Sequence, residues 1–147
     1  MHQNIPHQKL LQEIMPYTDI NVLPTFDDTF WYVIAEAMHA GLPNIATNIF
    51  AISEMVQHGV NGYLINLPVD KYGMIDIFWE KDMGKRTIWF EEQEVSVKNQ
   101  LKKYIIRLVE NEEIREEMGR KGREKALAKF HCQVRNKKLG DIYRRCK

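Results

Sequence analysis

The chain has 147 residues, of which 44% are hydrophobic and 28% charged, enough for one folded domain and too few for two complete α/β domains. A formal net charge of +1 argues against a nucleic-acid-binding protein. No uncharged apolar run approaches the roughly 20 residues of a membrane span, and the amino terminus does not resemble a secretory signal, so a cytoplasmic protein is expected. Cys132 and Cys146 lack metal-ligand spacing, and we expect neither a protein-bound metal nor a cofactor.

Charge is distributed unevenly along the sequence. Residues 1–75 hold two basic and seven acidic side chains, whereas residues 76–147 hold nineteen basic and thirteen acidic ones. Between Lys9 and Lys71 there is no Lys or Arg. We therefore expect no basic side chain beside a site built from this segment.

The first half of the sequence alternates predicted strands and helices. It begins with a helix that Asn4 caps and Pro16 ends. The next predicted elements are strands over 20–23, 44–47 and 62–66, and helices from near Thr29 to Gly41 and over 52–57. This alternation is typical of an α/β fold with a Rossmann-like parallel sheet and crossover helices.

The segment 68–94 interrupts the alternation. Two runs rich in β-branched and aromatic residues, 75–79 and 87–90, flank Asp82-Met83-Gly84, which predicts a β-hairpin or a packed insertion. The chain thus divides into a β/α core (1–67), this insertion or hairpin (68–94) and carboxyl-terminal helices (95–147). Three parallel strands are few for a sheet that needs both faces covered, so the chain resembles the back half of a doubly wound domain.

Three helices are predicted at the end of the chain, over about 95–110, 112–129 and 131–146. Gly119 and Gly122 are expected to weaken the second of them. In the third, four apolar side chains are expected to face inward: Val134, Leu139, Ile142 and Tyr143.

Two acidic residues bracket the start of the helix near Thr29. Asp28 lies just outside it and Glu36 follows eight residues later, roughly 12 Å along the axis and within a quarter turn. The free N–H groups at the start of the helix can bind a phosphate group between these two residues. A carboxylate can accept two hydrogen bonds from a ribose diol. Each residue also has a simpler interpretation: Asp28 as a helix cap, and Glu36 as part of a solvated face.

The run from Asp28 to Met38, followed by Gly41-Leu42-Pro43, resembles the E-x7-E signature of group 1 (family 4) retaining glycosyltransferases of the GT-B fold. Similarity to that family extends through further blocks: 44–47, 54–56, 59–65, 108–111, 115–119 and 129–130. The family has two Rossmann-like domains that face each other across a cleft, and the signature lies in the carboxyl-terminal, donor-binding domain. The resemblance implies a partial donor-binding domain that takes a UDP-, GDP- or ADP-linked sugar as substrate.

The resemblance also implies roles for individual residues. Glu36 would hold the nucleotide ribose, Asp28 would contact the donor sugar, and Thr29, Phe30 and Trp31 would approach the phosphates through their backbone. The aromatic rings of Phe30, Trp31 and Tyr32 have two interpretations: they stack on the nucleobase of the donor, or they are core or rim residues. The sequence departs from the family where Asp28 replaces Glu, where Thr29 and Trp31 replace glycine, and where Phe50-Ala51 replaces a glycine pair. No catalytic base can be assigned.

Members of this family take an Arg and a Lys from earlier in the donor domain to neutralise the diphosphate. This chain holds neither those early strands nor the acceptor domain, so the resemblance implies a fragment that does not transfer sugar alone. The alternative is a non-catalytic module that self-associates through its sheet edge. The basic tail, 129–147, is a solvated face or is attracted to an anionic membrane surface.

Overall fold

The computed structural model describes residues 5–27 and 32–145. Its sheet contains β1 (Asn21–Leu23), β2 (Asn44–Thr47) and β3 (Gly62–Ile65), which pair in parallel in that order. Asn44 pairs with Asn21 on one side and with Gly62 on the other. The helical elements are α1 (His7–Lys9), η1 (Leu10–Ile14), η2 (Met15–Tyr17), α2 (Tyr32–Ala40), α3 (Ile52–Met55), η3 (Asp76–Trp79), α4 (Met83–Glu110), α5 (Glu112–Lys129) and α6 (Cys132–Arg145).

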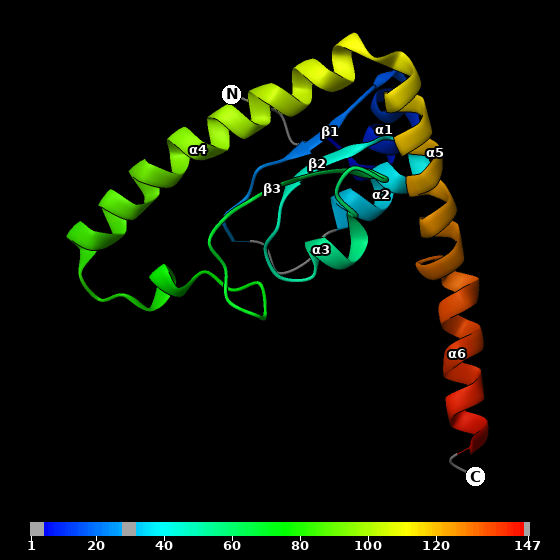
Figure 1. The fold of residues 1–147 in the computed structure, drawn as a ribbon. Coiled ribbons are helices and arrows are strands. Elements are labelled where there is room, and N and C mark those ends of the chain that lie inside the picture. Colours follow the sequence, from blue (N-terminus) through cyan, green and yellow to red (C-terminus); the bar gives the residue numbers. More distant parts are fainter. Residues whose placement is uncertain (1–4, 28–31, 146–147) are drawn as a thin grey trace.

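The predicted Rossmann-like parallel sheet is confirmed. Helices α2 and α3 lie on one face of the sheet, and the long helix α4 crosses the other face (Figure 1). Helix α5 packs beside α2 and also contacts α4 and β3. Ligands of parallel α/β sheets bind beyond the carboxyl ends of the strands, and the loops at Pro24 and Asn48 begin there.

The core lies between the two helical layers. All four residues of β2 are buried, since it is the central strand, and Ile45 and Ala46 have no exposed surface. Ile34 and Met38 of α2 cover one face of the sheet. The predicted apolar face of residues 95–110 is confirmed as the side of α4 that packs on the core, with Val97, Leu101, Tyr104, Ile105 and Leu108.

Two glycines fix how α5 packs against the end of α2. Gly41 follows α2 with a φ of +82°, the left-handed conformation that glycine adopts readily, and ends the helix as expected. A Cβ on Gly119 of α5 would overlap the carbonyl oxygen of Gly41 and would lie 2.9 Å from the carbonyl carbon. Gly119 therefore allows a close approach of two backbones, a role that its low helix propensity alone does not reveal.

The β-hairpin prediction for residues 68–94 is wrong. Residues 76–79 form the 3-10 helix η3, and the run 87–90 lies inside the 28-residue helix α4, which begins at Met83 rather than near Val95. Asp82 caps this helix, because its Oδ1 accepts hydrogen bonds from Gly84 N at 2.8 Å and Lys85 N at 3.3 Å. A side-chain cap, rather than a turn between two strands, explains the sequence around Gly84.

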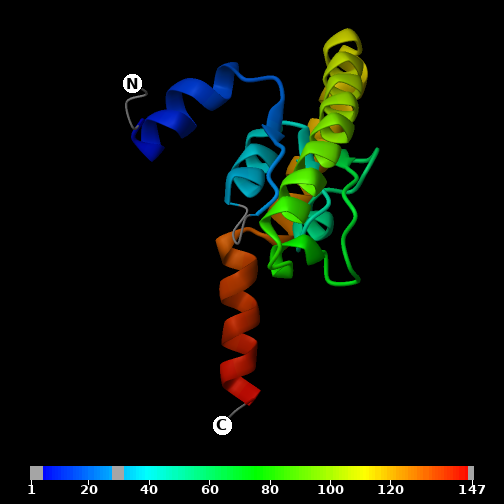
Figure 2. The same ribbon diagram turned by 90° about the vertical axis from the view of Figure 1, so that its left-hand side faces the viewer.

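The inward face predicted for the last helix is also wrong. Helix α6 extends away from the rest of the molecule (Figure 1 and Figure 2), and it contains no buried residue among those described. Leu139 is 42% exposed and Tyr143 70% exposed. The apolar spacing gives a helix, but none of the other elements that the structure describes buries a residue of its apolar side. Across the described ranges, no helix is both long and apolar enough to cross a membrane.

Candidate functional site

The structure describes two of the six predicted site residues. Asp28, Thr29, Phe30 and Trp31 lie outside the described residues. Tyr32 is the first residue of α2 as described and is 64% exposed, and Glu36 lies one turn further along the helix. The Glu36 side chain is 21% exposed and is therefore not enclosed in the protein interior.

The loop that follows β1 is attached to its neighbours at two points. Thr47 at the end of β2 donates a hydrogen bond from Oγ1 to the carbonyl oxygen of Thr25, 2.6 Å away. The ring of Phe26 packs edge-on against Trp89 and Phe90 of α4, at centroid distances of 6.2 and 5.5 Å. The first half of α4, which the sequence did not predict as helix, thus supports the loop that leads to α2.

Tyr32 and Glu36 line a cavity of about 530 Å³ between α2, α3 and the junction of α5 with α6. Its other lining residues are Ala35, His39, Ala51, Glu54, Met55, Lys129, Phe130 and Arg135. The volume lies within the range of small-molecule sites. Tyr32, Ala35, Ala51, Met55 and Phe130 provide apolar surface, and charge of both signs comes from Glu36, Glu54, Lys129 and Arg135.

The expectation that no basic side chain reaches this site is wrong. Lys129, at the end of α5, and Arg135, in the first turn of α6, line the same cavity as Glu36. The Arg135 guanidinium lies 3.2 Å from Asn136 Oδ1 and, within the described part of the chain, forms no ion pair. The segment between Lys9 and Lys71 has no Lys or Arg, and the basic side chains of this cavity come instead from residues about a hundred positions after Glu36.

Glu36 forms a close contact with the amino-terminal helical segment. His7 Nε2 lies 2.7 Å from Glu36 Oε1, and the imidazole is 65% exposed. His39, one turn after Ala35 on α2, bonds through Nδ1 to the Ala35 carbonyl at 2.8 Å. The contact with His7 holds the Glu36 carboxylate at the edge of the cavity, and sequence reasoning missed it because 29 positions separate the two residues.

The loop after β2 contains a residue with a left-handed backbone conformation. Phe50 has a φ of +44°, in the left-handed region that glycine favours, and it stands where a glycine of the family is usual. Its N–H donates to Gly73 O at 2.8 Å, which fixes this conformation from the segment after β3. Ala51 follows and lines the cavity, so the turn brings the start of α3 close to Glu36.

Comparison with known proteins agrees with this arrangement. Residues 3–73 match the family "Glycosyl transferases group 1", a range that includes all three strands and helix α2. Residues 3–73, slightly less than half of the chain, are therefore similar to group 1 glycosyltransferases. Tyr32 and Glu36, which line the cavity, lie within the matched residues.

Two curated proteins are similar to the chain. One is the N-acetyl-alpha-D-glucosaminyl L-malate synthase of Bacillus anthracis, 26% identical over 126 residues, which are 86% of this chain and 26% of that protein. The other is sucrose synthase 2 of Pisum sativum, 42% identical over 45 residues, which are 31% of this chain and 6% of that protein. The chain thus spans about a quarter of the length of the first relative and much less of the second.

Proposed function

We propose that the cavity beside α2 binds the nucleotide-sugar donor of a retaining glycosyltransferase, which transfers a hexosyl group to a glycan or to a lipid-linked acceptor. The observation that carries this proposal is that one cavity holds acidic side chains, Glu36 and Glu54, together with two basic ones, Lys129 and Arg135. A nucleotide sugar needs both, because its ribose diol pairs well with a carboxylate and its diphosphate with cations.

In this proposal each described residue has a distinct task. Glu36 accepts hydrogen bonds from the ribose hydroxyls, with its orientation set by His7. Arg135 and Lys129 balance the diphosphate charge, in both the bound donor and the departing nucleotide diphosphate. Tyr32 borders the entrance as a largely exposed aromatic ring. Asp28, Thr29, Phe30 and Trp31 complete the site through the contacts that the family resemblance implies.

The names of the relatives support a sugar-transfer reaction. One is named a synthase of a glucosaminyl L-malate and the other a sucrose synthase. Because this chain corresponds to about a quarter of the first relative, we propose that transfer requires an acceptor-binding part outside these 147 residues, and that the isolated chain binds donor without turning it over. Attraction of the basic tail to an anionic membrane surface stays a prediction.

Methionine methyl groups provide a direct test of donor binding. Met55 lines this cavity, so a chain labelled with [methyl-13C]methionine is titrated with UDP-glucose, GDP-mannose and ADP-glucose. We expect one of these donors to shift the Met55 signal. Glu36→Gln and Arg135→Gln should each weaken that donor about tenfold, since each removes a charge-assisted hydrogen bond.

Lys138→Gln provides the matched control. It removes one positive charge from an exposed position of α6 that does not line the cavity, and it should leave donor affinity within about twofold, because exposed charges act weakly at a distance. The proposal fails if none of the three donors moves the Met55 signal, or if Lys138→Gln weakens binding as much as Arg135→Gln.

A further inference from the structure

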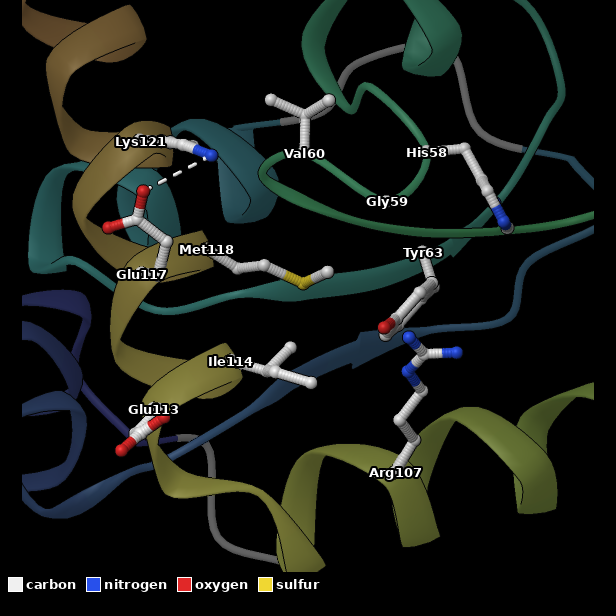
Figure 3. A pocket seen from close by; sticks show the side chains of 10 residues that line it. All are labelled: His58, Gly59, Val60, Tyr63, Arg107, Glu113, Ile114, Glu117, Met118 and Lys121. Atoms are coloured by element: carbon white, nitrogen blue, oxygen red, sulfur yellow. Dashed lines mark ion pairs between the residues drawn. The ribbon is translucent and has the colours of Figure 1, made fainter.

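A second cavity, of about 580 Å³, lies at the opposite end of the sheet, where β3 begins (Figure 3). Residues 58–60 of the turn before β3 form one wall, and the end of α4 and the first turns of α5 form the other. None of its lining residues belongs to the cavity beside Glu36. Its function therefore has to be inferred independently of donor binding.

The Tyr63 hydroxyl is the most unusual group in this cavity. Tyr63 is 4% exposed, and its hydroxyl is buried without a hydrogen-bond partner in the described part of the chain. Its ring is fixed, since it stacks on Tyr104 with centroids 4.6 Å apart and an interplanar angle of 6°. Figure 3 shows the hydroxyl pointing toward the middle of the lining residues, beside the Arg107 guanidinium. A buried hydroxyl loses its bonds to water, and a ligand acceptor would replace them.

Arg107 places a positive charge at the same corner. Its guanidinium carbon lies 5.8 Å from the centroid of the Tyr63 ring, and the side chain makes no ion pair within the described ranges. Two donors, a guanidinium and a phenol, thus face the same space without an acceptor between them. A carboxylate has two oxygens that can accept from both at once.

The rest of the cavity wall is mixed: Val60, Ile114 and Met118 are apolar, and the polar or charged residues are His58, Glu113, Glu117 and Lys121. Ile114 and Met118 point toward the centre in Figure 3, and Met118 is 5% exposed. Glu117 is already paired with Lys121 at 3.1 Å and with Arg120 at 2.6 Å. Glu113 stands on the side of the cavity away from Tyr63 (Figure 3). The Arg107 corner is therefore separated from both acidic side chains by apolar surface.

We propose that this cavity binds a small monocarboxylate with an apolar body. The carboxylate accepts hydrogen bonds from the Tyr63 hydroxyl and from Arg107, and the apolar body lies on Ile114 and Met118. The proposal does not depend on the function of the first cavity.

Phenylacetate is the probe for this site, with the full chain labelled at the methionine methyl groups. Phenylacetate should shift the Met118 signal and leave the Met55 signal in place, because the two methionines line different cavities. Phenylacetamide, which keeps the shape and lacks the charge, should bind at least about tenfold more weakly. Arg107→Gln and Tyr63→Phe should each weaken phenylacetate about tenfold, and Tyr63→Phe retains the ring that stacks on Tyr104.

Lys102→Gln is the control for charge, since it removes a positive side chain from an exposed position of the same helix outside the cavity. It should change the affinity for phenylacetate by less than about twofold. The proposal is overturned if phenylacetate does not shift Met118, if phenethylamine shifts it instead, or if Lys102→Gln weakens binding as much as Arg107→Gln.

Discussion

Gly119→Ala should loosen the contact that positions α2. The added Cβ would overlap the carbonyl oxygen of Gly41, and both partners are backbone atoms that a rotamer change cannot move. Helix α5 would have to shift away from α2. Overpacking of this kind lowers the free energy of unfolding by about 1–3 kcal/mol, and the higher helix propensity of alanine offsets about 1 kcal/mol of this loss. Taking the upper end for a backbone clash, we expect a net loss of about 2 kcal/mol in the free energy of unfolding.

Gly122→Ala is the matched comparison on the same helix. Its Cβ would lie 3.8 Å from the nearest atoms, of Asn61 and Met38, which is ordinary van der Waals contact. This substitution should therefore stabilise the chain by about 0.5–1 kcal/mol. Urea unfolding followed by circular dichroism measures both variants, with the m-value checked for constancy. Equal changes at the two positions, or a stabilised Gly119→Ala variant, would refute the inference that α5 approaches the Gly41 turn through Gly119.

Three further predictions concern local interactions. Asp82→Ala removes the cap of α4 and should lower stability by about 1 kcal/mol, with amide exchange fastest at the start of that helix. The hydrogen bond from Arg120 lowers the pKa of Glu117, so this pair stabilises the folded chain at neutral pH, and this stabilisation is lost as the pH falls below about 4.5. Thermal melts of Glu117→Gln should therefore show less acid sensitivity than melts of the parent chain. His7→Ala breaks an exposed contact with Glu36 and should cost less than about 1 kcal/mol in the same melts.

Local patterns in the sequence predicted the sheet well. Strand β2 has the predicted bounds, because Pro43 ends the preceding segment and the short run around Ile45 and Ala46 is followed by a polar loop. Helix α5 also has its predicted bounds, over Glu112–Lys129. In both cases the information lies within a few residues of the element itself.

The errors arise where the deciding interaction is distant or where a local signal has two meanings. The run 87–90 is rich in strand-favouring residues, although it lies in a helix. Its aromatic residues Trp89 and Phe90 pack against Phe26, which is more than 60 positions earlier, so local sequence does not reveal this contact. Gly84 was read as part of a turn, although it donates its N–H to the Asp82 cap. Helix α6 was predicted to bury an apolar face, and periodicity alone cannot say whether another element covers it.

The cavity beside α2 is not built by the signature segment alone. Glu36 and Tyr32 come from that segment, but helix α5 supports α2 from behind and ends at Lys129, and the first turn of α6 adds Arg135. The region that matches the family model stops at residue 73, before any of these supporting elements. In the proposed site, the signature segment contributes the carboxylate for the ribose, whereas the charge that balances the diphosphate comes from helices with no motif of their own. If so, substitutions of Lys129 and Arg135 should weaken donor binding as strongly as substitutions of Glu36, because each of the three is proposed to form a charge-assisted contact with the donor.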